Sequence, residues 1–337
     1  MTLQQKVGQL FMVGTPATQA GTTALDAVSG LHVGNVFLSG RSHAATAATA
    51  AVVSQLTALA TPDATAGLPL FVATDQEGGE VQVLQGPGMD AMPTALQQGA
   101  MPPPALQQAA TTWGGQLKAS GVNMNLAPVV DLIPSPQFAP DNPPIGGFDR
   151  QFGYDPATIT SHADAFRAGM SAAGVVSVVK HFPGLGAVTA NTDTDSGVTD
   201  TTTTATSASV GVFATEIQNG AKVVMMSSAI YTQLDAASPA VFSSKVVTGL
   251  LRGTLGFSGV IMSDDVSAAK QVSPWSPADR AILALQAGVD IVLVSASPEL
   301  AAPMVAAVVA KAQADPAFAK VVDDAARRVV ELKRQVL

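Results

Sequence analysis

Short, nearly uninterrupted apolar runs recur along this 337-residue chain, and segments of helical pattern separate them. Runs of this kind, which lack alternating polar residues, are typical of parallel strands that are buried on both faces. Because strands and helices alternate, the pattern predicts an α/β fold, and eight repeats predict a closed (β/α)8 barrel of the TIM type. The eight predicted strands lie in residues 9–15, 33–40, 70–79, 122–132, 175–184, 223–231, 260–265 and 291–297.

The length of the chain allows one barrel or two ordinary domains, since α/β barrels often exceed about 250 residues as one domain. No linker separates two cores, so we expect residues 1–337 to form a single barrel domain. One predicted helix is well delimited, because Pro277 lies near its start and Gly288 just past its end. The proline-rich stretch Ile133–Phe148 predicts a long rim loop, and the polar stretch Ser196–Ser209 predicts an exposed segment.

The composition excludes several classes of function. Hydrophobic residues make up 47% of the chain and charged residues only 12%, which is typical of a globular protein with a large core. The net charge is −8 and no run of Lys or Arg occurs, so we expect no nucleic-acid partner. No apolar stretch in the sequence is long enough for a membrane span. The absence of cysteine excludes disulfides, thiol nucleophiles and thiolate-bound metals.

Polar or ionisable side chains stand at the ends of most of the predicted strands. In a barrel, all parallel strands deliver their carboxyl ends to one rim, which is where active sites lie. We therefore expect these groups to converge there: Arg41, Asp75, Glu77, Asp131, Lys180, His181, Ser227, Asp264 and Asp265.

The aspartates in this set have both a catalytic and a structural interpretation. Asp264 or Asp265 suits a nucleophile or an electrostatic stabiliser, but either also suits the cap of the helix that follows. The two aspartates can divide these roles. Asp75 suits a ligand for two neighbouring hydroxyls of a sugar, or a residue that stabilises the turn before Gly78.

Lys180 and His181 are adjacent, so a regular strand points them to opposite faces. Both are available to one site only where the strand leaves the sheet. A lone histidine here is most often a core residue with satisfied hydrogen bonds, but a buried lysine beside it is rare without a partner. The pair therefore favours a site at the mouth of the fifth strand.

Six motifs, in this order, carry a resemblance to a known family: "MTLQQKVGQLFMVG", "DQEGGEVQVL", "RQFGYDP", "KHFPGLG", "MMSSAIY" and "LLRGTLGFSGVIMSDD". The chain resembles the β-N-acetylglucosaminidase branch of glycoside hydrolase family 3, and the resemblance spans essentially its whole length. "KHFPG" and "GFSGVIMSDD" are the most diagnostic. Members of this branch are retaining enzymes built on a single (β/α)8 barrel.

The resemblance implies a role for particular residues. Asp264 matches the nucleophile, which attacks the anomeric carbon and becomes glycosylated. The side chains that hold the sugar next to the cleaved bond match Asp75, Arg150, Lys180, His181 and Met226. The resemblance implies no metal and no organic cofactor.

The loop after the fifth strand departs from the family pattern. There the family has Lys-His-Phe-Pro-Gly-His-Gly, four residues and then Asp-Ser-His, whose last histidine is the acid/base. In this chain Leu185 replaces the first loop histidine and Asp193 replaces the catalytic one, and no histidine follows His181. Asp193 suits the acid/base role if burial or the like charge of Asp195 raises its pKa. Asp195 is the alternative acid/base, and a simple polar turn is the structural alternative.

Taken together, the sequence predicts a retaining exo-β-glycosidase that releases terminal β-linked N-acetylglucosamine from cell-wall glycans of the muropeptide type. We expect the loop from Gly184 to Gly197 to close over the site. A sugar-binding barrel with impaired catalysis and a β-glucosidase or phosphorylase-like activity are the alternatives. We expect a monomer in the cell envelope or secreted, as a lipoprotein whose anchor was removed, or alternatively in the cytoplasm. If Asp264 were pinned to backbone amides and turned away from any pocket, the hydrolase interpretation would fail.

Overall fold

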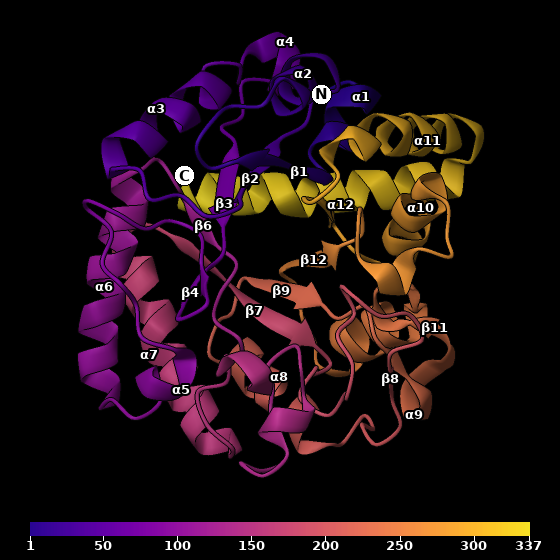
Figure 1. The fold of residues 1–337 in the computed structure, drawn as a ribbon. Helices are drawn as coiled ribbons and strands as arrows, with labels where there is room; N and C mark the ends of the chain where they lie inside the picture. Colours follow the sequence, from indigo (N-terminus) through magenta and orange to yellow (C-terminus); the bar gives the residue numbers. More distant parts are fainter.

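The computed structural model of the protein describes residues 1–337, and its centre is a closed barrel of eight parallel strands (Figure 1). Each barrel strand coincides with one of the eight predicted apolar runs, so the predicted (β/α)8 barrel is confirmed. The barrel closes where β1 pairs with the last strand, β13. The strands are β1 (Phe11–Pro16), β2 (Asn35–Ser39), β3 (Phe71–Thr74), β6 (Met124–Asn125), β7 (Val176–Phe182), β9 (Val223–Met226), β12 (Val260–Asp265) and β13 (Ile291–Val294).

A helix follows each barrel strand and packs outside it (Figure 1). These helices are α2 (Thr22–Gly30), α3 (Thr46–Thr57), α6 (Pro103–Ala119), α7 (Pro156–Ala172), α8 (Ala208–Gln218), the π-helix η4 (Lys245–Thr254), α10 (Pro277–Ala287) and α11 (Ala301–Ala314). Helix α10 has the predicted limits, since Pro277 is its first residue and Gly288 ends it with a φ of 113°. Glycine adopts this left-handed conformation without the penalty that a side chain imposes.

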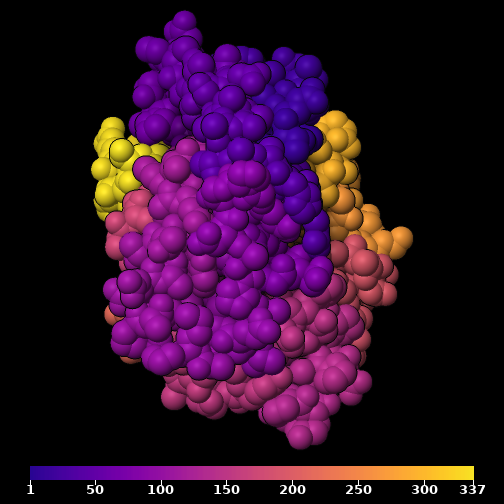
Figure 2. All heavy atoms as spheres, turned by 60° about the vertical axis from the view of Figure 1, so that its left-hand side comes forward, coloured from indigo at the N-terminus to yellow at the C-terminus, as the bar shows by residue number.

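Short elements decorate the barrel and its loops. They are α1 (Leu3–Gly8), α4 (Pro62–Thr65), α5 (Ala95–Gln98), α9 (Thr232–Asp235), the hairpin of β4 (Gln76–Gly78) and β5 (Val81–Gln82), and the small sheet of β8 (Thr199–Asp200), β10 (Ile230–Tyr231) and β11 (Ala236–Pro239). Figure 2 shows the face formed around α3 and α6, where the first half of the chain covers the surface and the C-terminal part emerges at the edges. None of the helices combines the length and the apolar character that spanning a bilayer requires.

The barrel strands are apolar on both faces because each face is buried against a different layer. Inside the barrel, side chains such as Met12, Phe71 and Met225 form one hydrophobic cluster. The alternate residues of the same strands, such as Val13 and Met226, join the larger cluster between the strands and the helices. This double burial explains why the sequence shows continuous apolar runs.

The last helix, α12 (Pro316–Val336), closes the barrel at the amino-terminal ends of its strands. In Figure 1 it is the long yellow helix that runs across the molecule. Its Val329 and Leu332 complete the cluster inside the barrel. The Nζ of Lys333 donates to the backbone carbonyl of Gly34, just before β2, at 2.7 Å. The opposite, carboxyl-terminal rim therefore remains available for a site.

Two loops of the rim correspond to the irregular stretches predicted from the sequence. The proline-rich stretch does form a long loop, interrupted by short 3-10 turns at Ala139–Asp141 and Gly146–Phe148. The stretch Ser196–Ser209 is only partly exposed, which corrects the prediction. Within it Asp200 is buried and accepts hydrogen bonds from the backbone of Thr202 and Thr203, and β8 pairs with β10.

Candidate active site

A pocket of about 280 Å³ opens at the carboxyl-terminal ends of the strands. Its volume lies at the low end of the range for small-molecule sites. Six of the predicted site residues line it: Asp75, Arg150, Lys180, His181, Asp193 and Asp264. Of the strand-end groups expected to converge at the rim, Arg41 and Ser227 do not line it, because Arg41 is exposed and paired with Glu80 while Ser227 is buried. Two larger hollows of about 700 Å³ each lie beside α12 at the other end of the barrel, and neither contains a predicted site residue. Because the ionisable groups gather at the rim, the smaller pocket is the candidate active site.

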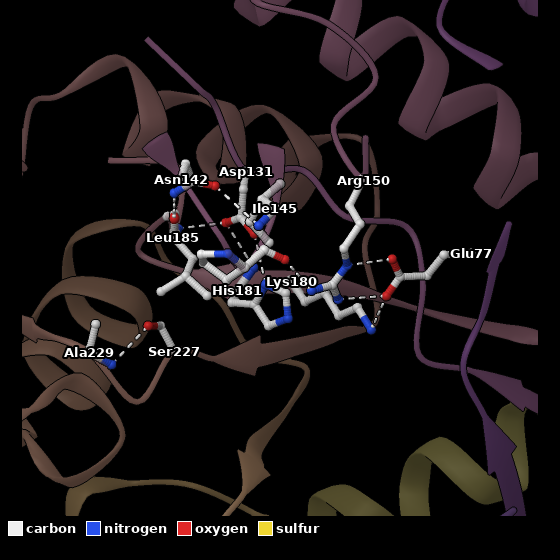
Figure 3. A network of polar contacts seen from close by, with 12 residues as sticks. Glu77, Asp131, Asn142, Ile145, Arg150, Lys180, His181, Leu185, Ser227 and Ala229 are labelled. Carbon is white, nitrogen blue, oxygen red and sulfur yellow. Dashed lines mark hydrogen bonds and ion pairs between the residues drawn. The ribbon is translucent and has the colours of Figure 1, made fainter. Parts of the chain in front are cut away.

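Two cations, the buried Lys180 and the partly buried Arg150, stand on one wall of this pocket and are held by Glu77 (Figure 3). The carboxylate of Glu77 accepts two hydrogen bonds of 2.8 Å from Arg150, one from Nε and one from Nη2, and lies 2.6 Å from Nζ of Lys180. Burial opposes ionisation of Glu77, but the charges of Arg150 and Lys180 outweigh it and hold its pKa at about 2. Glu77 therefore stays ionised and keeps both cations in place.

Asp75 joins this cluster from the end of β3. Its Oδ1 accepts a hydrogen bond of 2.8 Å from Nζ of Lys180, while Oδ2 has no hydrogen-bond partner within the protein. The side chain is partly exposed at the pocket wall. Burial lowers the pKa of Lys180, but Asp75 and Glu77 overcome this effect and raise the pKa above its ordinary value. A charged ammonium and a free carboxylate oxygen thus stand side by side, an arrangement that suits neighbouring hydroxyls of a sugar.

His181 is oriented by a fully buried carboxylate, that of Asp131 (Figure 3). Oδ2 of Asp131 lies 2.7 Å from Nδ1 of His181, and Oδ1 accepts from the backbone N–H of His181 and of Leu185. With Nδ1 engaged in this way, Nε2 is the ring nitrogen left without a partner in the protein. The carboxylate sets both the tautomer and the direction of the ring.

The aspartates at the end of β12 divide their roles, as the sequence allowed. The carboxylate of Asp265 accepts hydrogen bonds from the backbone N–H of Ser267, Ala268 and Ser295, so its role is structural. Asp264 lines the pocket and accepts only one hydrogen bond, through Oδ1, from its neighbour's N–H at 2.8 Å. Its Oδ2 has no hydrogen-bond partner in the protein. Asp264 is therefore neither pinned to backbone amides through both oxygens nor turned away from the pocket, so the hydrolase interpretation stands.

Asp193 lies on the loop after β7 and also lines the pocket. The residue as a whole reaches solvent, but its carboxyl group lies deep enough among the walls for burial to raise its pKa. The like charge of Asp264 raises it further, to about 6, against smaller opposing effects of Arg150 and His181. The sequence-based expectation named Asp195 as the like charge, and in the structure that charge belongs to Asp264.

Two predicted site residues do not line the pocket. Asp195 is exposed, and its Oδ2 accepts a hydrogen bond from the hydroxyl of Thr194. Met226 is fully buried among the side chains between the strands and the helices, whereas its neighbour Met225 faces the barrel interior and lines the pocket. The prediction for Met226 is therefore wrong by one residue, because successive side chains of a strand point to opposite faces.

Two residues that matter for the site were not among its predicted members, Glu77 and Asp131. Both were recognised as polar residues at strand ends, and that position was the available signal. Their function is to fix Arg150, Lys180 and His181, which requires contacts between segments 50 or more residues apart.

Comparison with known proteins gives a consistent result. The family model described as "Glycosyl hydrolase family 3 N terminal domain" matches residues 2–332. The crystal structure of the β-N-acetylhexosaminidase from Beutenbergia cavernae is similar over 99% of this chain and 98% of that one, with 64% identity and a TM-score of 0.98. The β-hexosaminidase of Xanthomonas campestris pv. campestris (strain B100) is 38% identical over 253 residues, 73% of either chain. An uncharacterized secreted glycosyl hydrolase of Arthroderma benhamiae is 37% identical over 68% of this chain, and the match spans 64% of the fungal protein.

Proposed function

The chain belongs to glycosyl hydrolase family 3, and on this premise we propose that it is a retaining exo-β-N-acetylglucosaminidase. One observation carries the proposal: a carboxylate with a free oxygen, Asp264, shares a small pocket with a carboxyl group of raised pKa, Asp193. A pair of carboxyl groups in opposite protonation states is what glycoside hydrolysis requires. The similarity to hexosaminidases, at 64% identity for one solved structure, supports the choice of sugar.

The reaction proceeds in two displacements at the anomeric carbon. In the first, the free oxygen of Asp264 attacks C1, the bond from C1 to the leaving oxygen breaks, and Asp193 gives its proton to that oxygen. In the second, Asp193 takes a proton from water, the water oxygen attacks C1, and the carboxylate of Asp264 departs. Each displacement inverts the carbon, so the configuration is retained overall.

The remaining polar groups of the pocket hold the sugar. Asp75 and Lys180 offer an acceptor and a donor side by side, and Arg150 adds a second cation. His181 contributes Nε2, oriented by its contact with Asp131. Because Glu77 and Asp131 fix these groups before the sugar binds, little conformational freedom is lost on binding.

The small volume of the pocket favours a single terminal sugar over an internal one, which supports exo action. We propose terminal N-acetylglucosamine of cell-wall glycans of the muropeptide type as the substrate. The proposed location is the cell envelope or the exterior, with the cytoplasm as the alternative, and the proposed state is a monomer that acts as one barrel domain.

Trapping of the covalent intermediate tests the proposal. The enzyme reacts with an activated 2-deoxy-2-fluoro-β-glycoside to form the glycosyl-enzyme. This intermediate is then hydrolysed only slowly, because fluorine destabilises the positively charged transition state. We expect the intact protein to gain the mass of one fluorosugar, located by peptide mapping on Asp264. Asp264→Ala should gain no mass and should lose turnover of an aryl β-N-acetylglucosaminide.

Asp195→Ala is the matched control, because this acidic residue of the loop lies outside the pocket. It should label and turn over like the wild type. Labelling of another residue, or persistent turnover by a folded Asp264→Ala variant, would reject the assignment.

A sugar-binding barrel without efficient catalysis is the second candidate, and the replacement of the family's loop histidine by Asp193 favours it. Such a protein would bind N-acetylglucosamine but gain no mass from the fluorosugar. A phosphorolytic enzyme would instead release a sugar 1-phosphate when phosphate replaces water, which product analysis detects.

A further inference from the structure

Two buried side-chain amides tie the loop from Gly184 to Gly197, which carries Asp193, to its neighbours. The first tie is Asn142, a fully buried residue of the proline-rich rim loop (Figure 3). Its Nδ2 donates to the carbonyls of Leu185 and Val188 at 3.0 and 2.8 Å. Its Oδ1 accepts from the N–H groups of Ile145 and Gly146. This amide therefore fixes the first part of the loop.

The second tie is Gln271, on the segment that follows β12, and its side chain is also buried. Nε2 donates to the carbonyl of Val198 at 3.1 Å, and Oε1 accepts from the N–H of the same residue at 2.8 Å. The side chain thus pairs with Val198 as a neighbouring strand would. Because Val198 directly follows Gly197, the tie fixes the far end of the loop.

The backbone of the segment that contains Gln271 also holds Asp193 itself. The N–H of Lys270 donates to the carbonyl of Asp193, and the N–H of Gln271 donates to the carbonyl of Thr192, both at 3.0 Å. The part of the loop from Thr192 to Val198 is therefore attached at both ends to the segment that contains Gln271. The sequence suggested a loop that closes over the site, and in the structure these hydrogen bonds attach its second half to the segment after β12.

We propose that Gln271 is a positioning residue that holds Asp193 at the leaving-group side of the pocket, an inference that rests on the proposed function. The carboxyl of Asp193 sits on a loop, and sites on loops lose precision unless supporting hydrogen bonds lock them. A general acid displaced by about 1 Å loses much of its effect. Gln271 does not line the pocket, so its effect on the reaction passes through the loop.

The dependence of the rate on the leaving group reveals this role. A dinitrophenyl group departs without a proton, whereas an unsubstituted phenyl group needs the general acid. Since kcat/KM covers the steps up to release of the leaving group, it isolates the step that Asp193 assists. For Gln271→Met, which keeps the length of the side chain and removes both hydrogen bonds, we expect kcat/KM to fall by about 10- to 100-fold for the phenyl β-N-acetylglucosaminide. The value for the dinitrophenyl substrate should stay close to that of the wild type.

The pH profile provides a second readout. Asp193 faces the negative charges of Asp264 and Asp265, the positive charge of Arg150 and the imidazole of His181. A loosened loop moves the carboxyl away from Asp264 and toward water, so the decline of kcat/KM at high pH should begin at a lower pH in the variant.

Asn123 supplies a matched control at the opposite end of the barrel. Its amide makes the same kind of pair, donating to the carbonyl of Leu70 at 3.0 Å and accepting from the N–H of Val72 at 2.8 Å. Asn123→Leu should lower the thermal stability about as much as Gln271→Met and change neither kcat/KM value. If Gln271→Met fails to fold, Gln271→Asn should also lower kcat/KM selectively for the phenyl substrate, by a smaller factor.

An equal change for both substrates in a folded Gln271 variant, or no change for either, would overturn the positioning role. If the wild type itself turns over neither substrate, the proposed function is rejected and this inference falls with it.

Discussion

Asp193 and Asp264 are carboxyl groups that share one pocket, and the proposed mechanism needs them in opposite protonation states. Burial and the charge of Asp264 raise the pKa of Asp193 to about 6, which keeps the carboxyl group largely protonated up to about that pH. A general acid must be protonated to act. For a substrate with a poor leaving group we therefore expect kcat/KM to be level just below pH 6 and to fall about tenfold per pH unit well above it. The measurement is the pH dependence of kcat/KM for a phenyl glycoside.

Asp193→Asn should remove this decline at high pH, because the titrating group is gone. The variant should still cleave a dinitrophenyl glycoside but should release its sugar slowly, since no base activates water. Azide needs no base, so its addition should restore turnover and yield the β-glycosyl azide as the anion displaces the carboxylate of Asp264. Persistence of the high-pH decline in Asp193→Asn would show that another group is the acid.

At the scale of elements, the rim is a set of loops that buried amides join to one another. Asn142 makes four hydrogen bonds: two connect the proline-rich loop with the loop after β7, and two lie within the proline-rich loop itself. Asn142→Ala leaves these backbone groups without partners, and we expect it to lower the free energy of unfolding by about 3 kcal/mol. Urea denaturation measures this change. Gln55→Ala, at an exposed position of α3, should change it by less than about 0.5 kcal/mol.

Most of this architecture was predictable from the sequence, because apolar runs and polar strand ends are local features. Asp75, Lys180, His181 and Asp264 were placed at the rim for that reason, and the structure brings them into one pocket. The exchange of Met226 for Met225 was not predictable, because an apolar run on both faces does not reveal which face of a strand looks inward.

Contacts between distant segments were the other part that the sequence did not reveal. The like charge that raises the pKa of Asp193 is that of Asp264, at the end of β12, whereas the sequence suggested the nearby Asp195. Likewise, Gln271 meets Val198 across 73 positions. Such pairs form only when the barrel brings the ends of different strands together, so no local pattern marks them.

Across the whole molecule, the end of the barrel that α12 closes contains one buried lysine, Lys333. Lys333 is 1% exposed and has no carboxylate partner. Its Nζ donates to Oε1 of Gln9 and to the carbonyl of Gly34, both at 2.7 Å, and lies 5.3 Å from the centre of the Phe71 ring. These contacts offset only part of the loss of hydration, and burial lowers the pKa of Lys333 from 10.5 to about 7.

This lowered pKa makes the stability of the protein depend on pH. Between about pH 7 and 10.5 the unfolded chain keeps the proton on Lys333 while the folded protein has released it. The unfolded state thus binds more protons, so the contribution of Lys333 to stability rises with pH across this window, by at most about 1.4 kcal/mol per pH unit. Lys333→Met should lack this rise, and urea denaturation of both proteins from pH 6.5 to 10 measures the difference. Lys320→Met, at an exposed position of the same helix, should keep the slope of the wild type. Equal slopes for the wild type and Lys333→Met would show that the buried amine keeps its proton in the folded protein.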